Sequence, residues 1–366
     1  MAMIVSIGSG KGGVGKSVIA ANLSMLLAKQ GKRVVLADLD VGGADAHILF
    51  GMLNPPRTLT DFVERRVDRL EDVLQQVSAH PFLRLIPGTG DTLATANLPY
   101  AKKKRLIRHF RQLQADVIIV DIGAGTSYHA LDFFLMADHY LTVATPDPTS
   151  VLDLYRFIKL AAIRRVLSAF LSRDAVTETL SDRDFCSIDE VIQAVSETDP
   201  NAKETASRTL QGFHPYLIVN RVSGKSRVNV LQLKKLLQEY VGGDLMMLGE
   251  IPDDPAMTRA VRSYLPVVEF EPTAPAALAL EKESAPEARG KRRQVYAVEV
   301  ERQLVARRED RAAVVGRRQK LTDLTVPGVA ARKGQPGRGG SEVVVVVEVG
   351  SVRSVPVEHR KAAVAQ

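Results

Sequence analysis

The stretch SIGSGKGGVGKSVIAANLS, residues 6–24, decides the fold of this 366-residue chain. Within it, residues 10–17 (GKGGVGKS) match the pattern G-x-x-x-x-G-K-[ST] of a phosphate-binding loop. The pattern is informative only between a strand and a helix, and here an apolar run at 3–7 precedes it and helix-forming residues follow. The loop also holds a second lysine, Lys11, besides the Lys16 that the pattern requires.

The chemistry of this loop predicts a nucleotide-binding site. Glycines let backbone N–H groups wrap phosphate oxygens, and the N-terminus of the following helix adds a field that favours negative charge. Lys16 is expected to reach the β and γ phosphates, and Ser17 to supply a hydroxyl ligand to Mg²⁺. The residues predicted to bind the nucleotide here are Gly10, Lys11, Gly12, Gly13, Val14, Gly15, Lys16 and Ser17.

Outward from the loop, short apolar runs alternate with longer helical patterns as far as about residue 280. This alternation predicts an α/β fold of the P-loop NTPase class, a mostly parallel sheet with helices on both faces. The first helix is expected over 16–30, with Gly31 as its stop. Strands are expected at 3–7, 33–37, 83–86, 116–120, 140–144, 216–219 and 245–248.

The chain divides by composition into two parts. Residues 1–280 are predicted to form the P-loop domain, with a helical insertion at about 163–212. Residues 281–366 hold 18 Lys and Arg against 11 Asp and Glu, which accounts for the whole net charge of +7. This tail is rich in valine and arginine and contains no Phe, Ile, Met or Trp, so we expect a low-complexity, disordered segment.

Composition also limits the cellular setting. No run of about 18 apolar residues occurs, and no signal peptide precedes the first strand, so a cytoplasmic protein is expected. The single cysteine, Cys186, excludes internal disulfides and an all-cysteine metal cage within one chain. We therefore expect no iron–sulfur cluster.

The segment KGGVGKS, with its additional Lys11, resembles the deviant Walker A motif of the MinD/ParA group of P-loop ATPases. The resemblance implies ATP and Mg²⁺ as cofactors and slow, partner-stimulated ATP hydrolysis. It also implies a homodimer in the ATP state, in which Lys11 reaches the partner subunit's nucleotide and Lys16 contacts its own. A cation supplied by another subunit is a known way to stabilise the charge of phosphoryl transfer.

Two aspartates leave the second predicted strand in the segment VVLADLD, at Asp38 and Asp40. Carboxylates at i and i+2 of a strand point the same way, which suits a site for Mg²⁺ and water. By the resemblance, Asp40 positions the attacking water and Asp38 lies near the metal. In ADVIIVDIGAG, Asp121 resembles the Walker B aspartate that holds Mg²⁺, and the turn at 123–125 resembles switch II.

Two later segments resemble the adenine pocket of the same family. In LIVNRV, Asn220 is implied to hydrogen-bond the base, with Arg221 stacking or capping beside it. In LGEIPDDPAM, Pro252 and Asp253 are implied to line the pocket.

Three functions remain open from the sequence. The first is a spatial regulator of the MinD or FlhG type, acting on the division site, flagella or other cargo, with possible peripheral contact to the inner face of the membrane. The second is a ParA-like partition ATPase that binds DNA nonspecifically, and the third is a nucleotide-dependent scaffold with little turnover. The basic residues considered for DNA contact are Lys225, Arg227, Lys234, Lys235, residues 102–105 and Arg108.

Overall fold

The computed structural model describes residues 2–40, 43–88, 100–171, 184–196, 199–224, 228, 230–241 and 245–284. The chain divides into two units, Met1–Arg311 and Ala312–Gln366, and every described residue belongs to the first. The predicted tail, residues 281–366, starts inside a helix that ends at Ser284, so its first four residues are helical; the rest of it and the DNA-contact candidates Lys225 and Arg227 lie outside the described residues.

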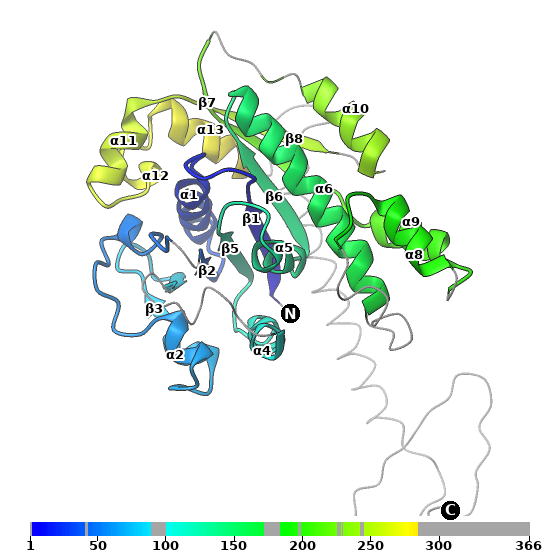
Figure 1. Ribbon diagram of the computed structural model, residues 1–366. Coiled ribbons are helices and arrows are strands. Elements are labelled where there is room, and N and C mark those ends of the chain that lie inside the picture. Colours follow the sequence, from blue (N-terminus) through cyan, green and yellow to red (C-terminus); the bar gives the residue numbers. More distant parts are fainter. Residues whose placement is uncertain are drawn as a thin grey trace, which may run out of the picture. The chain divides into compact units, whose positions relative to one another are not determined.

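One sheet forms the centre of the described part of the chain (Figure 1). Its described strands lie in the order β3-β4-β2-β5-β1-β6-β7-β8, and neighbours pair in parallel except β3, which is antiparallel to β4. The mostly parallel sheet confirms the predicted fold class. The strands are β1 (Met3–Gly8), β2 (Val34–Leu39), β3 (Gln75–Gln76), β4 (Leu83–Ile86), β5 (Val117–Ile122), β6 (His139–Ala144), β7 (Tyr216–Val222) and β8 (Met246–Pro252).

Helices cover both faces of this sheet (Figure 1). One face shares a core with α1, α11, α12 and α13, and the other shares a core with α2, α4, α5, α6 and α10, to which α8 and α9 are joined by packing on α6. None of the described helices is long and apolar enough to span a bilayer. The helices are α1 (Lys16–Lys29), α2 (Leu59–Val63), α4 (Tyr100–Phe110), α5 (Tyr128–Leu135), α6 (Pro148–Leu171), α8 (Ile188–Ser196), α9 (Ala202–Gln211), α10 (Val230–Val241), α11 (Pro255–Arg262), α12 (Val267–Phe270) and α13 (Pro275–Ser284), with short 3₁₀ helices η1 (Ile48–Phe50) and η2 (Leu70–Val73).

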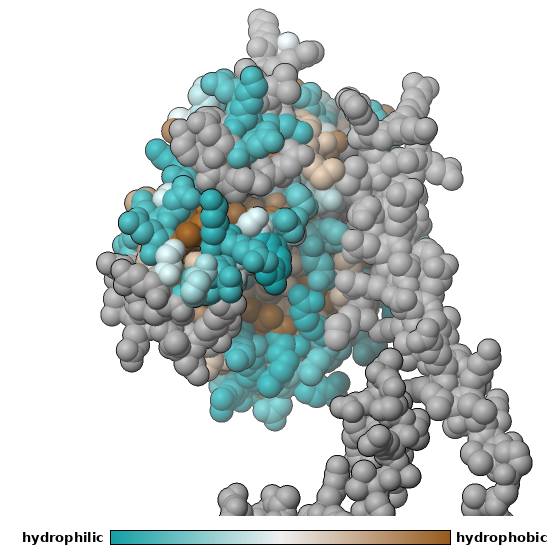
Figure 2. Space-filling view, turned by 90° about the vertical axis from the view of Figure 1, so that its right-hand side faces the viewer, coloured by the Kyte–Doolittle hydropathy of each residue, from teal (hydrophilic) through white to brown (hydrophobic). Residues whose placement is uncertain are grey.

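The inner strands are apolar throughout because both of their faces are buried. In β1, Ile4 packs in the core beneath α5 and α6, whereas Met3 and Val5 pack in the core beneath α1. Successive strand residues point to opposite faces, so a strand covered on both sides needs apolar residues at every position. Hydrophilic residues make up most of the coloured surface on the side shown in Figure 2, with hydrophobic residues between them.

Five of the described strands, β1, β2, β5, β7 and β8, extend further toward their carboxyl ends than the apolar runs predict. β2 continues to Leu39 and β5 to Ile122, so Asp38 and Asp121 are strand residues. Aspartate is disfavoured in strands, and a prediction from apolar runs therefore stops too early. The pairing of β2 with β5 places Asp38 opposite Asp121, which brings two carboxylates together at one edge of the sheet.

The predicted start of the helical insertion, at about residue 163, lies inside a helix rather than between two elements. α6 is continuous through residue 163, so the described residues of the segment predicted at 163–212 include the end of α6, α8 and α9. The short edge strand β3 was not predicted, because its two glutamines carry no apolar signal.

Candidate functional site

The glycine-rich loop follows β1 at the point where the strand order reverses. β5 lies on one side of β1 and β6 on the other. In open parallel sheets, ligands bind beside the carboxyl ends of the strands at such a point. The residues predicted to bind the nucleotide and the metal lie at the carboxyl ends of β1, β2, β5, β7 and β8 or directly after these strands. The fold therefore gathers them at one edge of the sheet.

Two glycines of the loop are required by close packing. A Cβ on Gly10 would lie 2.0 Å from a backbone carbonyl oxygen of α6, and a Cβ on Gly15 would lie 2.4 Å from Nδ2 of Asn220. Gly15 also has φ +95° and caps the N-terminus of α1. Around Gly12 and Gly13, no atom of the described residues lies within 4 Å of an added Cβ. The loop is therefore pinned at two points and open between them, as a phosphate cradle requires.

Lys16 and Asp121 form the buried part of the site. Lys16 is 6% exposed and Asp121 is 1% exposed. Neither carboxylate oxygen of Asp121 has a hydrogen-bond partner within bonding distance among the described residues. Burial is the main cause that raises the pKa of Asp121 to about 6; the Ser17 hydroxyl and the charge of Lys16 limit the rise, and the charge of Asp40 adds to it. A buried, unpaired carboxylate beside a hydroxyl fits a site for a divalent cation.

Asp38 organises the loop that follows β2. It is fully buried, its Oδ1 accepts the backbone N–H of Asp40 at 3.0 Å, and its Oδ2 accepts that of Ala46 at 3.0 Å. Burial raises the pKa of Asp38 well above its usual value, and the charge of Asp121 adds to this, although the two backbone donors act against it. Both oxygens of Asp38 are thus engaged in shaping the loop that holds Asp40.

Asp40 lies against the turn that follows β5. A Cβ on Gly123 would lie 3.0 Å from Oδ1 of Asp40, so a larger residue there would press on this carboxylate. The N–H of Gly125 in turn donates to the carbonyl oxygen of Ser9 at 3.0 Å. The loops after β1, β2 and β5 are therefore in direct contact.

Lys11 is exposed, in contrast to Lys16. Its Nζ donates to Oγ1 of Thr149, in the first turn of α6, at 2.9 Å, and its carbonyl oxygen accepts the hydroxyl of Ser9 at 2.7 Å. The two lysines of the loop thus differ in environment, since one is enclosed beside Asp121 and the other is presented at the surface.

A cavity of about 330 Å³ adjoins the loop at Gly15. All four residues that the sequence assigned to a base pocket, Asn220, Arg221, Pro252 and Asp253, line it. Asn220 is buried, and its Nδ2 donates to the carbonyl oxygen of Val14 at 2.8 Å, which ties the cavity to the loop. The other residues that line it are Val18, Asp254, Met257, Thr258, Val261 and Arg262.

Asp254 is a residue of this cavity that the sequence analysis missed. Its Oδ1 accepts the N–H of Ala256 in the first turn of α11 at 2.9 Å, and its Oδ2 accepts the N–H of Ala276 in the first turn of α13 at 3.0 Å. One carboxylate therefore caps two helices. The signal was present in the sequence, because Asp followed by Pro255 is a common start of a helix.

Asp254→Ala is expected to lower the free energy of unfolding by about 1–2 kcal/mol, since two helix N-termini lose their acceptor. Asp254→Asn keeps one carbonyl oxygen and is expected to lose about half as much. Urea unfolding of the full chain measures both. Equal stability of Asp254→Ala and the wild type would show that the two bonds contribute nothing.

Comparison with known proteins identifies the family. A family model described as the CobQ/CobB/MinD/ParA nucleotide binding domain matches residues 5–267. The antiactivator FleN of Pseudomonas aeruginosa is 36% identical over 159 residues, which are 43% of this chain and 55% of FleN, so the match spans about half of that relative. The septum site-determining protein MinD of Bacillus subtilis is 30% identical over 248 residues, 62% of this chain and 91% of that protein. The structure of MinD from Pyrococcus horikoshii, solved with Mg-ADP, has a TM-score of 0.55 at 21% identity and covers 77% of this chain and 94% of that one.

The fold and the loop define a P-loop nucleotide-binding protein. The chain belongs to the CobQ/CobB/MinD/ParA family of nucleotide-binding domains, and within it to the MinD/ParA group. The family that the loop resembles is thereby confirmed.

Proposed function

We propose that the chain binds ATP with Mg²⁺, hydrolyses it, and alternates between an ATP-bound dimer and a monomer. The observation that supports this most directly is the different placement of the two loop lysines. Lys16 is enclosed beside the unpaired carboxylate of Asp121, whereas Lys11 is exposed at the surface.

In the proposed complex, residues 10–17 wrap the phosphates of ATP and the base enters the cavity beside Gly15. The apolar side chains of Val18 and Met257 line this cavity, and an aromatic base needs such surfaces. Ser17 and Asp121 hold the cation, which neutralises charge on the phosphates when bound. Asp38 was predicted as a metal residue, but since backbone donors engage both its oxygens, we assign it the positioning of Asp40.

Asp40 is proposed to orient the attacking water. Its carboxylate lies against Gly123, in the turn that follows Asp121, so it stands between the loop that holds the phosphates and the turn that responds to them. Lys11 is proposed to contact the nucleotide of the partner subunit, and its bond to Thr149 holds it at the surface until then.

The test is the mass of the full chain in solution, measured by size exclusion with light scattering in ATP and in ADP. We expect a dimer in ATP and a monomer in ADP. Lys11→Ala is expected to stay monomeric in ATP while it still binds nucleotide, because the enclosed residues are untouched. Lys32→Ala, the removal of a lysine outside the loop, is the matched control and is expected to dimerise as the wild type does.

A monomer in every condition, or a dimer unaffected by Lys11→Ala, would contradict the proposed switch. Nucleotide binding by Lys11→Ala, followed by fluorescence of a labelled ATP analogue, separates loss of dimerisation from loss of folding.

For the cellular role, we propose spatial positioning of a cargo as the first candidate. It is supported by the relatives, which include proteins named for septum-site and flagellum-site determination. We further propose a cytoplasmic location, with peripheral membrane contact tested by co-sedimentation with liposomes in ATP and in ADP.

DNA partition remains the alternative proposal, but the structure removes some of its candidate contacts. Lys103 is buried and paired with Asp132, and the Arg105 guanidinium lies 4.0 Å from the ring centroid of Phe62. Binding of ATP-loaded protein to nonspecific DNA at low salt would favour this alternative.

A further inference from the structure

A second cavity lies on the opposite face of the sheet from α1, where α4, α5 and α6 meet. Its volume is about 380 Å³. Neither the loop nor the residues of the base pocket contribute to it, so it belongs to a different site. The residues that line it are Lys103, Lys104, Ile107, Arg111, Asp132, Leu135, Met136, Arg164, Arg165 and Ser168.

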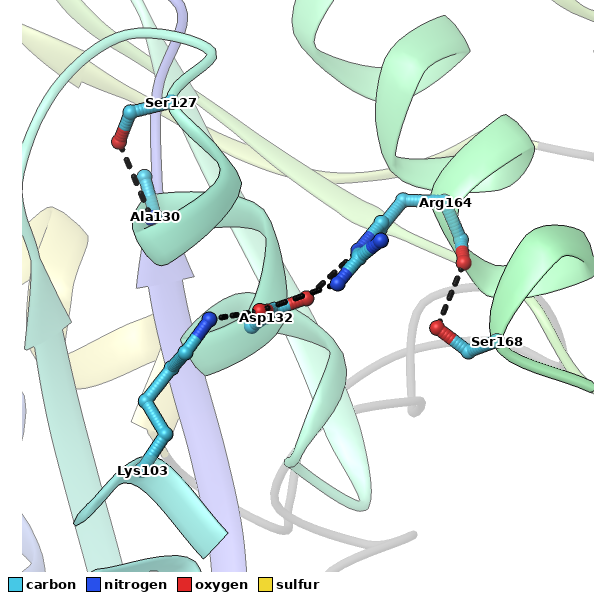
Figure 3. Close-up of polar contacts among 6 residues, drawn as sticks. All are labelled: Lys103, Ser127, Ala130, Asp132, Arg164 and Ser168. Atoms are coloured by element: carbon cyan, nitrogen blue, oxygen red, sulfur yellow. Dashed lines mark hydrogen bonds and ion pairs between the residues drawn. The ribbon is translucent and has the colours of Figure 1, made fainter. Parts of the chain in front are cut away.

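Basic side chains dominate the polar lining of this cavity. Five of the described lining residues are Lys or Arg, and Asp132 is the acidic one among them. Figure 3 shows Lys103 from α4 and Arg164 from α6 converging on Asp132 of α5. Nε of Arg164 lies 2.7 Å from Oδ1 of Asp132. One carboxylate thus fixes two cations in place before any ligand arrives.

The remaining cations, Arg165, Arg111 and Lys104, have no partner among the described acidic residues that line the cavity. Arg165 donates to the carbonyl oxygen of Thr209 and to the hydroxyl of Tyr140. Arg111 donates to the carbonyl oxygen of Met136 and pairs with Asp138, a neighbouring acid that does not line the cavity. Lys104 is exposed and has no ion-pair partner among the described residues. The cavity therefore keeps a positive surplus even when both aspartates are counted.

Apolar side chains complete the lining. Ile107 and Leu135 pack against the core but are not fully buried, and Met136 is 7% exposed, so part of their apolar surface lines the cavity beside the basic side chains. A bare inorganic anion would pair with the rim but leave this apolar surface in water. A peptide segment that carries both carboxylates and an apolar side chain complements both parts of the lining.

We propose that this cavity is a docking site for an acidic, partly apolar peptide segment of a partner protein. The carboxylates of the segment pair with Lys104 and with the cations fixed by Asp132, and an apolar side chain covers Ile107 and Leu135. The site is connected to the nucleotide loop through rigid elements, because α5 follows the turn at 123–125 and α6 bears Thr149, the partner of Lys11, at its start.

The test is selection of a library of short random peptides on the full chain, followed by fluorescence titration of the enriched peptides. We expect enriched sequences that combine Asp or Glu with Leu, Ile or Phe. Lys104→Glu and Ser168→Glu place carboxylates at exposed positions of the lining, and each is expected to weaken these peptides at least about fivefold. Lys102→Glu makes the same charge change on α4 outside the lining and is expected to stay within about twofold.

Three results would overturn the proposal. They are no enrichment, enriched peptides without acidic residues, and acidic peptides that bind all three variants as they bind the wild type. Displacement of the peptides by millimolar inorganic phosphate alone would show a site for small anions instead. Because the titration needs neither ATP nor turnover, its outcome is independent of the proposed ATPase cycle.

Discussion

Asp121→Asn is expected to slow ATP hydrolysis roughly 100-fold and, at the same time, to stabilise the nucleotide-free protein. The loss of activity follows from the proposed role in holding Mg²⁺, since an amide lacks the negative charge that the cation needs. The gain in stability follows from burial. A carboxylate with both oxygens buried and without hydrogen-bond partners among the described residues is costly to keep ionised, and an amide carries no such charge.

The pKa of Asp121 gives the size and the pH range of this gain. The carboxyl titrates near 3.8 in the unfolded chain and at about 6 in the folded one, so between these values the folded state binds more protons. The wild type therefore loses stability as the pH rises through this range. A difference of about two pKa units between the folded and unfolded states corresponds to roughly 3 kcal/mol. This value is the upper limit of the gain in unfolding free energy that Asp121→Asn is expected to show above about pH 7.

Urea unfolding in EDTA without nucleotide, at about pH 4.5 and about pH 7.5, measures this effect. The free energy of unfolding of Asp121→Asn should clearly exceed that of the wild type at the higher pH. At the lower pH the difference should be much smaller. Asp45→Asn, the removal of an exposed carboxylate, is the control and should change stability by less than about 0.5 kcal/mol. A lower stability of Asp121→Asn at both pH values would show that the folded chain stabilises the charge.

The nucleotide loop was predictable because its residues are contiguous. Glycines, a lysine and a serine at fixed spacing between a strand and a helix specify one conformation, and the first helix begins at Lys16 as predicted and ends at Lys29 rather than Gln30. The lining of the cavity beside the loop was also predicted in part. The sequence supplied Asn220 and Pro252 by resemblance, and the structure places both in one cavity with Gly15.

Contacts between distant segments could not be predicted from local patterns. The bond from Lys11 to Thr149 joins residues 138 positions apart, and the bond from Asp254 to Ala276 joins two helices that no spacing rule connects. The basic cavity is a further example, because Lys103, Asp132 and Arg164 stand on three helices and each reads as an ordinary charged residue in the sequence. Packing of helices on one face of the sheet brings them together.

Asp40→Ala is expected to lower the ATP turnover at least about 100-fold while ATP binding and the ATP-dependent dimer persist. The substitution removes the carboxylate that lies against Gly123 but leaves the backbone N–H of Asp40, which bonds to Asp38. The loop after β2 therefore keeps its hydrogen bond to the strand, and the effect falls on the chemical step. Steady-state phosphate release measures turnover, and light scattering measures the dimer.

The same experiment distinguishes an ATPase from a scaffold. Asp45→Ala, in the same loop but exposed, is the matched control and should keep wild-type turnover. If Asp40→Ala turns over as fast as the wild type, Asp40 does not orient the attacking water. If the wild type releases phosphate no faster than ATP does without protein, while it still dimerises in ATP, the chain is a nucleotide-dependent scaffold. The dimer would then be controlled by exchange of nucleotide rather than by its hydrolysis, because ATP binding alone would set its lifetime.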